Sequence, residues 1–205
     1  MITWEWPRCE ERAKDGALRQ RAGKGAFMNT VMELIEKQGF DCVGTCAASD
    51  LKVLEEVRHM CEADRCHKYG KTWACPPGCG DIHDIERQMH EYSYCAVVQS
   101  VGQLEDEFDG ETIIETSAKQ NERFNKLLED LDAEGLGTEV MSLSTAQCRN
   151  CKTCTYPDEP CRFPDKRFVS MSASGVLVAE TCRKAGIPYN HGKNTIAYTS
   201  CVLYN

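Results

Sequence analysis

Several signatures that assign a protein to a class are missing from this sequence of 205 residues. No stretch approaches the roughly 18 consecutive apolar residues of a membrane span, so we expect no membrane association. The start, Met1 to Arg8, lacks a basic segment followed by an apolar one, so we expect no secretory signal and a cytoplasmic location. Basic residues are scarce: 24 Lys and Arg face 32 Asp and Glu, and the net charge of -8 argues against nucleic-acid binding.

Well-known catalytic motifs are also absent. The sequence contains no G-x-G-x-x-G fingerprint of a dinucleotide-binding fold, no G-x-S-x-G turn of an α/β-hydrolase and no H-E-x-x-H zinc motif. It also lacks the C-x3-C-x2-C triplet that is usual in radical S-adenosylmethionine enzymes. Four large enzyme classes are therefore disfavoured.

Cysteine, by contrast, is abundant, with 14 residues. A chain of this length buries enough core to fold without disulfide bonds. In a reducing compartment, so many cysteines indicate metal binding or redox chemistry. Eight of them form two groups: Cys61, Cys66, Cys75 and Cys79 first, then Cys148, Cys151, Cys154 and Cys161.

Hydrophobic periodicity predicts helices that alternate with strands. We expect helices over 26–38, 50–60, 81–91, 112–134 and 172–185, and strands over 40–47, 93–101, 138–144 and 195–204. This order favours an α/β fold, a single layered domain with two cysteine-rich metal-binding loops. Residues 1–39 would be an N-terminal helical extension and residues 40–205 the cysteine-rich α/β metal-binding domain. Ser170 or Ser172 is expected to cap the last helix, and Cys42, Cys46, Cys95 and Cys182 to be buried in helices and strands.

The second group has the more specific spacing. Cys148-x2-Cys151-x2-Cys154 places three thiols within seven residues, as in bacterial ferredoxins, and Cys161 follows after six more residues as a candidate fourth ligand. An iron–sulfur cluster is the favoured interpretation. Tetrahedral zinc is the alternative, and a redox-active C-x2-C pair is a third.

The first group is more loosely spaced, at x4, x8 and x3. A loop that contains glycine and Pro76-Pro77 still has the reversals needed to wrap a metal centre. Trp73 and Tyr69 would either cover a cluster from water or pack in the core.

These motifs together resemble a known family. The run from Cys66 to Pro77, CHKYGKTWACPP, and the later Cys148-x2-Cys151-x2-Cys154 with Pro160-Cys161 are similar to the predicted metal-binding proteins catalogued as domain of unknown function 2284. The resemblance covers about residues 40–205. It implies metal binding, with iron–sulfur expected and anaerobes as the usual source. It also implies that Cys79 is a local addition, in which case the first group would leave one iron open.

Three functions follow as hypotheses. The first is an iron–sulfur protein with one or two [4Fe-4S] clusters that transfers electrons to a redox partner protein, docked on an acidic surface. The second is an enzyme whose incompletely ligated cluster binds substrate in a pocket with His67, Arg149, Arg162 or Lys166. The third is a zinc-stabilised interaction module.

Overall fold

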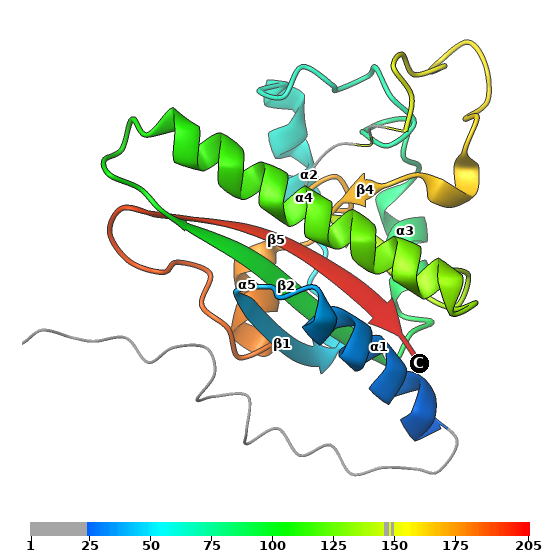
Figure 1. Ribbon diagram of the computed structural model, residues 1–205. Coiled ribbons are helices and arrows are strands. Elements are labelled where there is room, and N and C mark those ends of the chain that lie inside the picture. The colour runs from blue at the N-terminus through cyan, green and yellow to red at the C-terminus, as the bar shows by residue number, and fades with distance from the viewer. Residues whose placement is uncertain (1–23, 146–147, 149) are drawn as a thin grey trace, which may run out of the picture.

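The computed structural model describes residues 24–145, 148 and 150–205, which include a mixed five-stranded sheet (Figure 1). The strand order is β1-β2-β5-β3-β4, antiparallel throughout except for the parallel pair β3 and β4. The strands are β1 (Cys42–Ala47), β2 (Tyr94–Gln103), β3 (Met141–Ser144), β4 (Val169–Ser170) and β5 (Thr195–Tyr204). The helices are α1 (Lys24–Lys37), α2 (Glu55–His59), α3 (Ile82–Met89), α4 (Gly110–Ala133) and α5 (Val178–Lys184).

Helices cover both faces of the sheet. On one face, α1 and α4 pack Val31, Ile35, Phe124, Leu127 and Leu131 against Ala96 and Val98 of β2. On the other, α3 and α5 pack Ile85, Met89 and Cys182 against Cys95 and Val97 of the same strand. Because successive β2 side chains point to opposite faces and both faces are buried, this strand reads as a continuous apolar run. The α/β prediction is confirmed.

Helix α4, the longest in the described chain, lies unusually close to the sheet. A Cβ on Gly102 of β2 would lie 2.1 Å from Thr116 Oγ1 of α4. The fully buried Gln120 donates from Nε2 to the Val98 carbonyl at 3.3 Å and to Ser200 Oγ at 3.1 Å. These bonds satisfy the buried amide nitrogen and hold α4 across β2 and β5.

Two expected helices are shorter than predicted. In place of a helix from 50 to 60, residues 51–54 are extended, Val53 pairs with Val176 in an antiparallel bridge, and α2 begins at Glu55. The last helix begins at Val178 rather than at 172, because residues 171–175 form a tight turn in which Gly175 has φ +73°.

The predicted cap of this last helix is also wrong. Ser170 Oγ accepts a hydrogen bond from the Ala173 N–H at 3.1 Å, so it closes the turn that precedes the helix. Leu177 is the N-cap residue of α5 and no side chain caps that end, which excludes Ser172 as well.

The cysteines expected in helices and strands are buried as predicted. Cys42, Cys46, Cys95 and Cys182 are at most 8% exposed. Burial raises the pKa of Cys182 to about 11, and a hydrogen bond with Cys95 together with burial raises that of Cys46 well above its usual range. Cys46, Cys95 and Cys182 therefore stay protonated at neutral pH and pack as small apolar side chains.

The N-terminal part of the described chain belongs to the same core. Residues 1–23 of the expected extension lie outside the described residues, whereas Val31 and Ile35 of α1 are fully buried. Within the described chain, no helix is both long and apolar enough to span a membrane.

Substituting Gly44 tests the close packing of β1 against α5. A Cβ there would lie 2.3 Å from the Ala185 carbonyl oxygen and 2.8 Å from Ile187 Cγ2, so Gly44→Ala is expected to lower the free energy of unfolding by about 2 kcal/mol. Gly110→Ala is the matched control, because nothing lies within 4 Å of its Cβ position at the start of α4. Urea denaturation measures both, and equal stability of the two variants would contradict the packing.

Candidate metal centre

The first cysteine group lies on the segment between α2 and α3. Cys61 is in the 3-10 turn Met60–Ala63 that continues α2, and Cys79 comes two residues before Asp81, the residue that caps α3. The four cysteines differ in exposure: Cys66 is exposed, Cys61 is half-buried, and Cys75 and Cys79 are only 9% and 5% exposed. The group therefore extends from the surface into the core.

Neighbouring thiols of this group affect the pKa of Cys61 and that of Cys75. Burial raises the pKa of Cys61, and the Cys66, Cys75 and Cys79 thiols raise it further. Burial likewise raises the pKa of Cys75, with added contributions from Cys66 and from Cys148 of the second group. These mutual effects indicate that the four thiols and Cys148 lie in the same part of the molecule.

Two arginines face the buried end of the group. Arg58 Nη2 donates to Cys79 Sγ at 3.4 Å and also to the Gly80 carbonyl oxygen. Burial raises the pKa of Cys79, while the positive charges of Arg58 and Arg167 oppose that shift. Both cations would stabilise a negatively charged centre at Cys79.

A buried hydroxyl adds a donor at the same place. Thr72 is 9% exposed, and its Oγ1 makes no well-formed hydrogen bond within the described residues. It nevertheless lies close enough to the Cys75 thiol to oppose the rise in that pKa. An unsatisfied buried donor is costly, and a thiolate or an inorganic sulfide would accept a hydrogen bond from this hydroxyl.

The second cysteine group lies on the connection from β3 to β4. Cys148, Cys151, Cys154 and Cys161 are all half-buried, and Figure 1 shows this yellow segment beside the cyan first group. The two segments are docked by Trp73, whose ring meets Tyr156 edge-on with centroids 4.9 Å apart and whose Nε1 donates to the Glu159 carbonyl at 2.9 Å. The ring of Trp73 thus joins the two loops.

Gly78 makes this docking possible. A Cβ on Gly78 would lie 2.5 Å from the Thr72 carbonyl oxygen and 2.8 Å from Cε2 of Tyr156. Only glycine leaves room for the Tyr156 ring at this distance. The contact places the second loop against the first next to Cys79.

The thiols are near one another without forming a finished ligand set. Among the residues that the structure describes, no three Cys, His, Asp or Glu side chains are arranged to hold a metal ion. The donor chemistry still fits an anionic metal centre, since soft thiol ligands, two arginines and an unsatisfied hydroxyl surround one place. Assignment of the eight cysteines as ligands stays a prediction.

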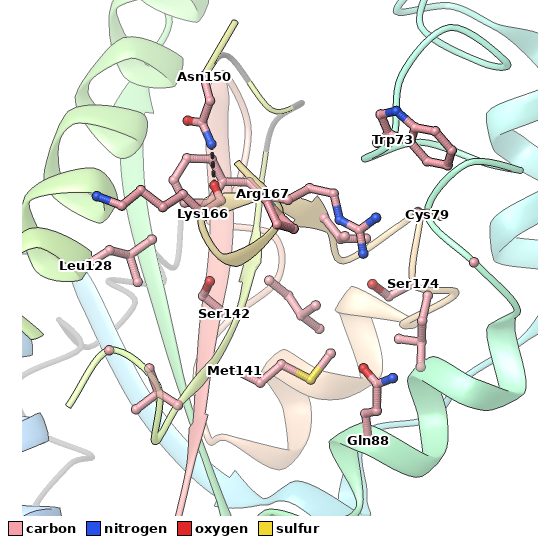
Figure 2. Close-up of a pocket in the computed structure, with 18 of the residues that line it drawn as sticks. Trp73, Cys79, Gln88, Leu128, Met141, Ser142, Asn150, Lys166, Arg167 and Ser174 are labelled. Carbon is pink, nitrogen blue, oxygen red and sulfur yellow. Dashed lines mark hydrogen bonds between the residues drawn. The ribbon is translucent and has the colours of Figure 1, made fainter. Parts of the chain in front are cut away.

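A cleft of about 900 Å³ opens beside Cys79 (Figure 2). Its walls are α3, the second half of α4, β3 and the segment of the second loop before β4. Of the polar residues expected around a substrate, Lys166 lines the cleft, His67 and Arg162 do not, and Arg149 lies outside the described residues.

Sequence reasoning missed several residues at this site. Arg58 and Arg167 approach Cys79 from distant parts of the chain, Tyr156 of the second loop packs at Gly78, and Thr72 lies near the Cys75 thiol. No spacing rule signals such contacts. The Pro-Pro pair beside Cys75 and the glycines of the first loop were the available hints, and they indicated only a sharp change in chain direction.

Comparison with known proteins gives one match. The family described as "Predicted metal-binding protein (DUF2284)" matches residues 45–204. No curated protein and no solved structure matches the chain.

Removing the Trp73 side chain should release the second loop from the first. Trp73→Ala loses the ring contact and the hydrogen bond to Glu159, so trypsin is expected to cleave the second loop several-fold faster, whereas Trp73→Phe keeps the ring contact and is intermediate. Tyr69→Ala is the control, because the Tyr69 hydroxyl bonds to Glu62 within the first loop. Mass spectrometry of the fragments measures the rate, and an unchanged rate in Trp73→Ala would refute the docking.

Proposed function

Because the chain belongs to the family of predicted metal-binding proteins known as domain of unknown function 2284, we propose that it is an iron–sulfur protein that transfers electrons to a partner protein. Cys61, Cys66, Cys75 and Cys79 would hold a [4Fe-4S] cluster. The single observation behind this proposal is the mutual proximity of these four thiols, with Arg58 bonded to Cys79.

The surroundings suit an iron–sulfur cluster better than a structural zinc ion. A cluster presents inorganic sulfides as well as thiolates, so it has more acceptors for surrounding donors. Thr72 and Arg58 supply such donors at Cys75 and Cys79. Zinc with four thiolates is the alternative, and the presence of acid-labile sulfide distinguishes the two.

A second cluster would be held by Cys148, Cys151, Cys154 and Cys161. Support comes from the C-x2-C-x2-C spacing and from Cys148, which lies close enough to affect the pKa of Cys75. Two centres on loops docked through Trp73 and Tyr156 would be near enough to exchange electrons.

Electron exchange with a partner requires access from solvent. Cys66 is exposed, so the first group reaches the surface at this residue. The chain has a net charge of -8, which favours a partner with a basic docking face and an association rate that falls with salt.

The cleft favours a second function, in which an incompletely ligated cluster would bind substrate. Cys79 lines the cleft and is also the cysteine that the family resemblance leaves in doubt as a ligand. An open iron at this position would act as a Lewis acid toward a molecule in the cleft.

Metal analysis tests the proposal directly. Protein purified without oxygen is expected to contain about four iron and four sulfide per chain for one cluster, or about eight of each for two. Replacing all four cysteines of the first group by alanine, or all four of the second, should remove the iron and sulfide of one cluster. Cys182→Ala in the core is the control. Zinc without sulfide, even after anaerobic reconstitution with iron and sulfide, would overturn the iron–sulfur assignment.

Arg58 should tune the reduction potential of the first centre. Its positive charge beside Cys79 favours the more negative, reduced state, so Arg58→Gln is expected to lower the potential by roughly 60 mV, equivalent to about 1.4 kcal/mol for one electron. Arg65→Gln, an exposed change in the same loop, is the control for net charge. Redox titration followed by EPR measures both, and equal shifts would contradict a specific role for Arg58.

A further inference from the structure

The cleft beside Cys79 has the size and composition of a binding site for a small organic molecule. Its volume of about 900 Å³ lies within the roughly 300–1,000 Å³ typical of ligand pockets. Apolar side chains from three different elements line it: Ile85 from α3, Leu128 from α4, and Met141 from β3. A ligand with an apolar body would bury that surface.

Arg167 is the distinctive polar group of this cleft. Its guanidinium makes no hydrogen bond or ion pair within the described residues, although the residue is half-buried. Figure 2 shows the side chain extended from the second loop toward Cys79 and Ser174. A partly desolvated guanidinium without a carboxylate is unfavourable, and its planar donors suit a carboxylate from a ligand.

Three of the acidic residues that line the same cleft are engaged elsewhere. Asp81 caps α3 by accepting from the His83 and Asp84 N–H groups, and Asp84 pairs with Arg87. Glu129 pairs with Lys126. The carboxylates of Glu91 and Asp132 come from the segment after α3 and from α4, not from the second loop that carries Arg167.

Lys166 is a second cation that lines the cleft. It directly precedes Arg167 in the chain and forms no ion pair within the described chain. Its carbonyl oxygen accepts a hydrogen bond from Asn150 Nδ2, which holds the second loop in place above the cleft (Figure 2). The Lys166 side chain extends toward α4 and that of Arg167 toward Cys79, so the two cations lie at different sides of the cleft (Figure 2).

We propose that this cleft binds a small organic acid, with its carboxylate on Arg167 and its apolar body on Ile85, Leu128 and Met141. The inference goes beyond the metal assignment, since the cleft walls come from α3, α4 and β3 whatever the thiols hold. The bound carboxylate would lie beside Cys79, so the ligand would be adjacent to the first cysteine group.

Calorimetry with a matched pair of probes tests the charge and the apolar body separately. The probes are 2-naphthoate and its uncharged analogue 2-naphthamide, added to the full chain purified without oxygen. We expect 2-naphthoate to bind at least about tenfold more tightly than the amide, as one charge-assisted hydrogen bond provides. Arg167→Gln should remove this preference, and Arg183→Gln on α5, outside the cleft, should keep it.

A second variant keeps the test independent of the thiols. Leu128→Glu places a carboxylate on the α4 wall and should weaken 2-naphthoate more than 2-naphthamide. Equal affinity of the two probes for the unmodified protein, absence of binding, or an undiminished preference in Arg167→Gln would overturn the proposal. Iron and sulfide are measured on the same samples, so failure of the metal assignment is seen separately from failure of the cleft assignment.

Discussion

Close packing around Gly175 brings the ends of both cysteine loops together at one turn. A Cβ there would lie 2.4 Å from Ile82 Cδ1 and 3.0 Å from the Leu54 carbonyl oxygen, the two residues that flank the first loop. The same turn is tied to the end of β3, where the second loop begins, because the Met171 N–H bonds to the Ser144 carbonyl at 3.0 Å. With the ends of both loops fixed against one turn, thiols far apart in the chain are held on the same side of the sheet.

The chemistry of the thiols follows from this placement. Burial at Cys75 and Cys79 disfavours thiolates, and burial alone would leave these side chains as inert, protonated groups. Arg58 and Thr72 oppose that tendency at the same two residues. The position is poorly solvated and several donors converge on it. Such surroundings stabilise a fixed anionic group more than a thiol that titrates freely.

The sequence predicted those elements whose stability is local or follows from a regular pattern. The apolar stripe of 112–134 marks α4 because one face of a helix is buried on a sheet. Residues 51–54 and 172–177 were expected in helices, yet they pair with each other through Val53 and Val176, a long-range contact that periodicity does not detect. Cysteine spacing identified candidate ligands because it too is a local pattern, whereas Arg58 and Arg167 approach Cys79 only through the fold.

The unequal burial of the first cysteine group makes its two ends different. Cys66 faces solvent at one end, and Cys79 faces the cleft at the other, with Cys75 buried between them and the second loop. On the two proposals, a partner protein would dock near Cys66 and a small organic acid would bind beside Cys79, on different surfaces. The two ligands would then not compete, and both would be bound at once without a rearrangement of the domain.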